Sequence, residues 1–123
     1  MSKIVVVEDS KLMRHLLRRV LEQAGHEVEA WEDLAASEIP ERIKNGAPDL
    51  IVSDYQMPGC NGLTLVRMAR KVRPELPVVM VTSTRDPDVM APLRRLDVQH
   101  ILHKPLQEGE LMDAIRQCLE PVD

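Results

Sequence analysis

Short apolar runs alternate along the chain with longer segments in which apolar residues recur every three or four positions. A continuous apolar run without polar alternation is typical of a strand buried on both faces of a parallel sheet. Such runs occupy residues 4–7 (IVVV), 50–52 (LIV) and 78–81 (VVMV). Val28 and Ala30 alternate with glutamates and predict a weaker strand near the sheet edge, and residues 101–102 predict a short last strand.

The first periodic segment predicts an amphipathic helix that begins after Ser10, a favourable N-cap, and ends at Gly25. Its apolar face consists of Leu12, Met13, Leu16, Leu17, Val20 and Leu21. Its other face carries the basic residues Lys11, Arg14, His15, Arg18 and Arg19. We interpret this basic face as solvated, with docking of a partner protein as the alternative.

Four further helices follow from the pattern. One starts near Ser37, because Pro40 fits comfortably only in the first turn of a helix. The next covers roughly residues 63–72, and another begins at residues 86–88. Pro92 lies within the span of that helix and is expected to delay, kink or partly unwind it. The last helix places Leu111, Ile115 and Leu119 on one face.

Five strands alternating with five helices predict an α/β fold, with a parallel sheet, right-handed crossovers and helices on both faces. The 123 residues are the size of one domain, and 44% hydrophobic with 29% charged residues is the balance of a chain with a packed core. Neither a linker nor an internal repeat is visible, so residues 1–123 are expected to form a single domain.

Composition excludes several classes of function. Sixteen Lys and Arg against twenty Asp and Glu give a net charge of −4, which disfavours binding to nucleic acid or to an anionic membrane. Only 2% of the residues are aromatic, too few for a platform on which bases stack. Two cysteines, Cys60 and Cys118, are interpreted as free thiols. No apolar run suits a signal peptide or a membrane span, so we expect a cytoplasmic protein.

Polar residues stand where the predicted strands end. Glu8 and Asp9 follow the first strand, and Asp54 ends the third. If these strands are neighbours, three carboxylates share one pocket and repel one another unless a cation compensates. Mg²⁺ suits such oxygen ligands and completes its coordination shell with water and phosphate. Thr82 and Lys104, at the ends of the fourth and fifth strands, add the hydroxyl and the ammonium that a phosphoryl group needs.

A carboxylate can itself act as a nucleophile and form an acyl phosphate. Asp54 is the natural candidate, because it ends a buried strand just before a turn that can leave its oxygen exposed. Glu8 and Asp9 are adjacent in sequence and better placed as metal ligands. Each of these residues alone is a weak signal, and the indication of phosphoryl chemistry comes from their combination in this order.

The motifs KIVVVEDS, DLIVSDYQMPGCNG, VVMVTST and HILHKPL resemble those of the response-regulator receiver domain of two-component signalling, in the same order and over essentially the whole chain. The resemblance implies a flavodoxin-like, doubly wound (βα)5 fold with strand order 2-1-3-4-5. It also implies phosphorylation of an aspartate, in a Mg²⁺-dependent reaction, by a sensor histidine kinase or a histidine phosphotransfer protein.

Carried over position by position, the resemblance makes Asp54 the phosphoacceptor. Glu8, Asp9, Asp54 and the backbone carbonyl of Gln56 become the Mg²⁺ ligands. Thr82 would donate a hydrogen bond to the phosphoryl oxygens, and Lys104 would form an ion pair with them.

In this family the output face consists of the fourth helix, the fifth strand and the fifth helix, and we expect a monomer or a weak dimer through this face. Ile101 departs from the family pattern, because an aromatic ring that reports the movement of the threonine usually stands there. Pro87 and Pro92 alter the fourth helix, which carries the signal. The kinase partner, the output and the lifetime of the phosphoryl group do not follow from the sequence.

The leading hypothesis is thus a phosphorylation-activated signalling switch, not a metabolic enzyme, which stands alone or forms the N-terminal part of a longer protein. A phosphorylation-independent receiver-like interaction module is the alternative. A phosphatase of the haloacid-dehalogenase type is disfavoured, because Gln56 occupies the place of its second aspartate. A flavin- or nucleotide-binding module is also disfavoured, since Glu8 and Asp9 would repel phosphate where such a module needs a phosphate-binding loop.

Overall fold

A computed structural model describes residues 2–32, 34–57 and 59–120. Five parallel strands form one sheet in the order β2-β1-β3-β4-β5, which confirms the predicted topology. The strands are β1 (Lys3–Val7), β2 (Glu27–Trp31), β3 (Leu50–Asp54), β4 (Val78–Thr82) and β5 (His100–His103). The strand predicted to be weak, β2, is an edge strand, and the apolar runs form the three central strands.

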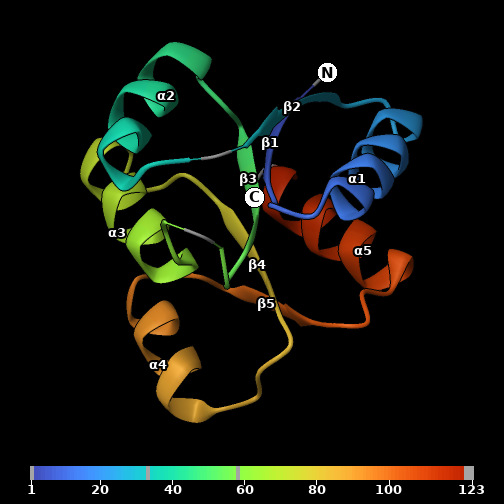
Figure 1. Ribbon diagram of the computed structural model, residues 1–123. Helices are drawn as coiled ribbons and strands as arrows, with labels where there is room; N and C mark the ends of the chain where they lie inside the picture. Colours follow the sequence, from blue (N-terminus) through green and yellow to red (C-terminus); the bar gives the residue numbers. More distant parts are fainter. Residues whose placement is uncertain (1, 33, 58, 121–123) are drawn as a thin grey trace.

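The helices cover the two faces of the sheet unequally (Figure 1). Helices α1 (Lys11–Gln23) and α5 (Glu108–Leu119) lie on one face, and α2 (Ile39–Gly46), α3 (Gly62–Val72) and α4 (Pro87–Arg95) lie on the other. Each face has its own apolar core. Val6, Val52 and Leu111 belong to the core under α1 and α5, whereas Val5 and Ile51 face the other three helices.

Helix α1 begins and ends as predicted, but its apolar face is narrower than the sequence indicated. The Ser10 hydroxyl caps the helix by accepting a hydrogen bond from the Met13 N–H, and Gly25 adopts a φ of +95° just beyond its end. Leu12 and Leu16 were expected in the core and are 70% and 44% exposed, so that expectation is wrong. At 3.6 residues per turn the six apolar positions span about half of the helix circumference, which is more than one sheet face covers.

Pro40 lies in the first turn of α2, whereas Pro92 lies inside α4. A 3₁₀ turn (Ala36–Glu38) precedes α2, and Pro40 lies in the first turn of the α-helix, as predicted. Helix α4 starts at Pro87, capped by the Asp86 carboxylate, and continues through Pro92 to Arg95. The expected delay or unwinding is therefore wrong, since the cap at Asp86 starts the helix before Pro92 is reached, and the alternative of a kink at Pro92 stays a prediction.

Gly62 brings the start of α3 close to the ends of β3 and β4. Its N–H donates a 2.7 Å hydrogen bond to the carbonyl of Tyr55, the residue after Asp54. A Cβ atom at this position would lie 2.6 Å from the Met80 sulfur and 3.0 Å from the Tyr55 Cα. The absence of a side chain at Gly62 thus lets α3 hold the backbone that leaves Asp54.

We expect Gly62→Ala to lower the free energy of unfolding by about 1–3 kcal/mol, because the added methyl group overlaps Met80 and the backbone of Tyr55. Urea denaturation followed by circular dichroism measures this change. The matched control is Gly109→Ala in α5, where a Cβ meets nothing within 4 Å and stability should stay equal or rise by up to about 1 kcal/mol. Equal effects of the two substitutions would contradict the close approach at Gly62.

Candidate functional site

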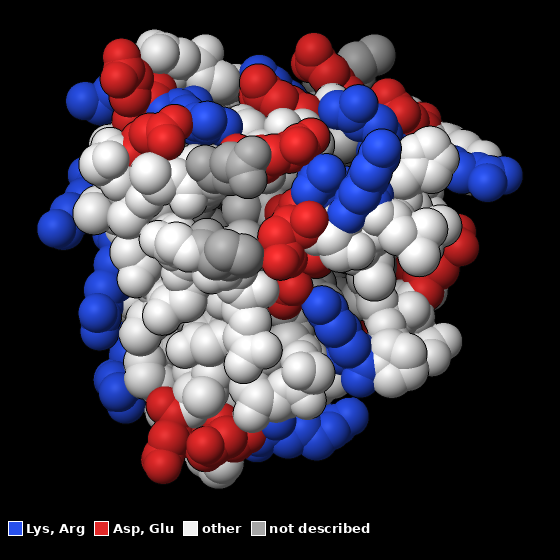
Figure 2. All heavy atoms as spheres, viewed as in Figure 1, with Lys and Arg blue, Asp and Glu red and all other residues white. Residues whose placement is uncertain are grey.

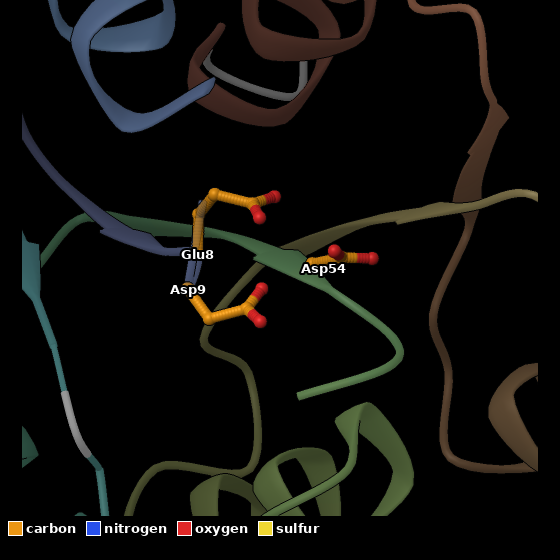
Figure 3. Close-up of side chains that lie close together, drawn as sticks. All are labelled: Glu8, Asp9 and Asp54. Carbon is orange, nitrogen blue, oxygen red and sulfur yellow. The ribbon is translucent and has the colours of Figure 1, made fainter. Parts of the chain in front are cut away.

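The carboxyl ends of β1 and β3 lie side by side, at the point where the chain order in the sheet reverses. Glu8 and Asp9 follow β1 directly, and Asp54 is the last residue of β3. Each of the three side chains offers an oxygen within 4.8 Å of the oxygens of the other two (Figure 3). The structure therefore brings together the three carboxylates that the sequence predicted to share a pocket.

Lys104 supplies the positive charge closest to this cluster. Its ammonium donates a 2.9 Å hydrogen bond to Asp54 Oδ2, and its backbone N–H donates to the Thr82 carbonyl at 3.0 Å. Burial lowers the pKa of Lys104, but the hydrogen bond and the charge of Asp54, with the charges of Glu8 and Asp9, raise it by more. The ammonium therefore stays protonated and offsets part of the repulsion among the carboxylates.

Glu8 is the most buried of the three acidic residues, with 3% of the residue exposed, against 7% for Asp54. One of its oxygens accepts a 3.0 Å hydrogen bond from the Ser10 N–H. Burial, together with the charge of Asp54, raises the pKa of Glu8 from 4.5 to about 7, against the lowering effects of the Ser10 N–H and of Lys104. A divalent cation at this place would offset the same cost.

Thr82 ends β4 and is 2% exposed. Its hydroxyl accepts a 3.1 Å hydrogen bond from the Thr84 N–H. The Thr84 hydroxyl in turn accepts one from the Asp86 N–H at 3.1 Å, and the Asp86 carboxylate accepts one from the Asp88 N–H at 2.9 Å. Three successive side chains therefore connect the end of β4 to the first turn of α4, a row of contacts that the sequence did not reveal.

Arg14 is a second feature that the sequence did not reveal, because its position placed it on the solvated face of α1. The side chain is only 14% exposed. Nη1 donates hydrogen bonds to the Glu8 carbonyl at 2.8 Å and to the Asp9 carbonyl at 3.0 Å. Nη2 lies 3.5 Å from a carboxylate oxygen of Glu32. A guanidinium that contacts two consecutive carbonyls leaves no signal in a helical pattern of charges.

The remaining predicted positions surround this cluster. Gln56 lies in the loop after β3 and is exposed, and its role as a carbonyl ligand stays a prediction. Ile101 is partly buried and packs against the core under α2, α3 and α4. Both cysteines are free, and burial raises the pKa of the Cys60 thiol. On the face shown in Figure 2, acidic atoms gather near the centre, with basic atoms beside them on the side of α1.

The donor set fits a small, hard divalent cation. All three side chains offer carboxylate oxygens, the ligand type that Mg²⁺ prefers, and the cluster lies at the carboxyl ends of β1 and β3. Burial and the neighbouring Asp54 charge raise the pKa of Glu8, and a bound cation would favour its charged form. Glu8, Asp9 and Asp54 are thus the residues that would hold the ion.

The five-stranded parallel sheet of order 2-1-3-4-5 is that of a flavodoxin-like fold, and three carboxylates and a lysine gather at its switch point. Residues 4–116 match the family model of the response regulator receiver domain, and the chain belongs to this family. Receiver domains of two-component response regulators are phosphorylation-regulated signalling domains, which favours that hypothesis over the phosphatase and the flavin- or nucleotide-binding module.

Relatives and solved structures agree with the family. The chain is 29% identical over 119 residues to the C4-dicarboxylate transport transcriptional regulatory protein DctD of Pseudomonas aeruginosa, covering 97% of this chain and 25% of DctD. It is 28% identical to protein CcdB of Bacillus subtilis, covering 97% of this chain and 98% of CcdB. The chemotaxis response regulator CheY4 of Vibrio cholerae, at 26% identity, superposes with a TM-score of 0.85 over 97% of this chain and 99% of that one. The chain therefore spans a quarter of DctD and nearly all of CcdB and CheY4.

Among the described residues, no helix has the length and apolar character that crossing a membrane requires.

We expect Glu8→Gln to raise the free energy of unfolding at pH 8, without added metal, by about 1–3 kcal/mol, because it removes a buried charge. The folded protein keeps the Glu8 proton up to a pH of about 7, whereas the unfolded chain loses it near 4.5. The contribution of Glu8 to stability therefore falls between these two values, and the difference between variant and wild type should vanish below pH 4.5. Denaturant titrations across this pH range measure it.

Mg²⁺ should reverse the order of stability of these two proteins. At about 100 times its dissociation constant a ligand adds about 2.7 kcal/mol, and the wild type, with all three carboxylates, should gain more than Glu8→Gln. Glu22→Gln, at an exposed position in α1, is the matched control and should follow the wild type. An equal Mg²⁺ effect in wild type and Glu8→Gln would contradict a role of Glu8 in the metal site.

Proposed function

We propose that the chain is a signalling switch that accepts a phosphoryl group on Asp54 in a Mg²⁺-dependent reaction. The observation that supports this most directly is the place of the Asp54 carboxylate, which is 93% buried yet hydrogen-bonded to the Lys104 ammonium at 2.9 Å and grouped with Glu8 and Asp9. A structural carboxylate needs one partner, whereas a phosphoacceptor needs compensation for the charge that arrives with the phosphoryl group.

The reaction forms one bond and breaks another at phosphorus. An oxygen of Asp54 attacks the phosphorus of a phosphohistidine, the P–N bond breaks, and the imidazole leaves with its electron pair and takes up a proton. With a small acyl phosphate, the P–O bond breaks and a carboxylate leaves. Glu8, Asp9 and Asp54 would hold the Mg²⁺, which would neutralise negative charge during the transfer.

Two further side chains of this site would contact the product. The Lys104 ammonium, which is paired with Asp54 Oδ2, is close enough to form an ion pair with an oxygen of the phosphoryl group on Asp54. The Thr82 hydroxyl accepts a hydrogen bond from its own loop, so its proton is free to be donated to another phosphoryl oxygen. Hydrolysis of the acyl phosphate would return the protein to its first state, so the chemistry is a self-catalysed cycle and the chain is not a metabolic enzyme.

A protein is the phosphoryl donor that the surface beside this site suits best. Leu12 and Leu16 are the large apolar side chains that the structure leaves exposed on α1, the helix that starts directly after Glu8 and Asp9. Apolar side chains one turn apart with basic neighbours fit a helical surface that presents a phosphohistidine. We propose that the chain is cytoplasmic, that its donor is a sensor histidine kinase or a histidine phosphotransfer protein, and that its output is a change in the face of α4, β5 and α5.

Incubation with acetyl phosphate and Mg²⁺ should add one phosphoryl group to the wild type, as measured by intact mass. Asp54→Asn and chelation of Mg²⁺ should each abolish the adduct, because the first removes the nucleophile and the second the compensating charge. Glu22→Gln should behave as the wild type. An adduct that persists in Asp54→Asn would overturn the assignment of the phosphoacceptor. If neither acetyl phosphate nor a phosphohistidine donor modifies the wild type, the phosphorylation-independent interaction module becomes the better hypothesis.

The double variant Leu12→Ser/Leu16→Ser separates donor docking from chemistry. Transfer from a phosphohistidine protein should slow by about ten-fold or more, because two apolar contacts at the interface are lost. Phosphorylation by acetyl phosphate should keep its wild-type rate, since the small donor needs no docking surface. Both rates are measured as the initial formation of the Asp54 adduct. Equal slowing with both donors would show that the leucines act on the fold of α1 and not on docking.

A further inference from the structure

The acidic turn after β1 lacks the regular support that holds the strands. The sheet pairing of β1 ends at Val7, so the carbonyls of Glu8 and Asp9 lie beyond the last ladder hydrogen bonds. In the part of the chain that the structure describes, the side chain that donates to both of them is Arg14. The hydrogen bond to the Glu8 carbonyl is partly buried, where water replaces a donor poorly next to a packed core, and the one to the Asp9 carbonyl is exposed.

Arg14 reaches these carbonyls from the first turns of α1. Its own N–H donates to the Ser10 carbonyl at 2.9 Å as part of the helix. Its guanidinium then turns back under the loop, with Nη1 shared between the two carbonyls and Nη2 beside Glu32. The planar guanidinium is rigid, so contacts made through two of its nitrogens fix the turn relative to both α1 and the segment after β2.

We propose that Arg14 is a positioning residue of the metal site: it holds the backbone of Glu8 and Asp9 so that their carboxylates meet Asp54. This inference rests on the proposed Mg²⁺ site. Arg14 does not contact the carboxylates through these hydrogen bonds; it fixes the backbone from which two of the three carboxylates project. Its effect on metal binding is thus one of geometry, as for groups that orient the ligands of other metal sites.

Geometry and charge predict opposite effects for the loss of Arg14. A positive charge close to the pocket repels a divalent cation, so an effect of charge alone would make Arg14→Met bind Mg²⁺ more tightly. Loss of the support of the turn would weaken binding, because the carboxylates would have to be ordered on each binding event. The direction of the change therefore separates the two causes.

The experiment measures Mg²⁺ dissociation constants by isothermal titration calorimetry, with the fluorescence of Trp31 as a second readout. Trp31 is the single tryptophan of the chain and lines the same small pocket as Glu8 and Asp9. We expect Arg14→Met to raise the dissociation constant by about ten-fold. Arg14→Lys keeps the charge but loses the planar guanidinium, and its Mg²⁺ dissociation constant should lie between those of Arg14→Met and the wild type.

Arg18→Met is the matched control. Arg18 is one turn further along α1 and donates to the Val28 carbonyl at 3.3 Å, with no contact to the acidic turn. Arg18→Met removes the same charge from the same helix but no hydrogen bond to the acidic turn. Its Mg²⁺ dissociation constant should therefore stay within about two-fold of that of the wild type. Circular dichroism establishes that each variant is folded, and Arg14→Lys carries the test if Arg14→Met does not fold.

The outcomes separate this inference from the proposed function. Weaker Mg²⁺ binding in both Arg14 variants, with Arg18→Met unchanged, supports it, and phosphorylation by acetyl phosphate should then recover at saturating Mg²⁺. Unchanged or tighter binding in folded Arg14→Met overturns it, even if the wild type is phosphorylated normally. A wild type that binds Mg²⁺ but accepts no phosphoryl group would overturn the proposed function and leave the positioning role standing.

Discussion

Repulsion among three carboxylates at one edge of the sheet is the constraint on which the rest of this structure depends. Glu8, Asp9 and Asp54 are brought within 4.8 Å by the pairing of β1 with β3, and the Lys104 ammonium compensates for only one of the three charges. The free energy gained by the apolar cores on the two faces of the sheet offsets this electrostatic repulsion. Stability and function are therefore opposed at one place, and a cation relieves the opposition.

The surroundings of the cluster restrain it from several elements. Gly62 lets α3 approach and hold the backbone just beyond Asp54. Arg14, from α1, holds the two carbonyls beyond β1, and the backbone of Lys104 is tied to that of Thr82. Each restraint acts on backbone and not on a carboxylate. The segments that carry the carboxylates are thus held through their backbones, while Asp54 Oδ2 and one Glu8 oxygen accept hydrogen bonds from Lys104 and Ser10.

Most of the fold and the members of the site could be predicted from the sequence, because buried strands and strand-end residues leave strong local patterns. The apolar runs marked the central strands, and the strand order followed from the family resemblance. Leu12, Leu16 and Arg14 were assigned to the wrong surroundings, since a helical period gives the direction of a side chain but not the width of its neighbour or the reach of a long guanidinium. Pro92 was misjudged because the cap at Asp86 outweighs a proline farther along the helix.

The hydroxyl group of Thr82 can form two hydrogen bonds at once, one as an acceptor and one as a donor. The Thr82 hydroxyl oxygen accepts from the Thr84 N–H through a lone pair, and the hydroxyl keeps a proton that can be donated to a different partner. The Thr84 hydroxyl and the Asp86 carboxylate likewise accept hydrogen bonds from backbone N–H groups, toward the first turn of α4. Position 101 is isoleucine and has no aromatic ring. The first turn of α4 is nevertheless connected by hydrogen bonds to Thr82, the residue that would contact a phosphoryl group on Asp54.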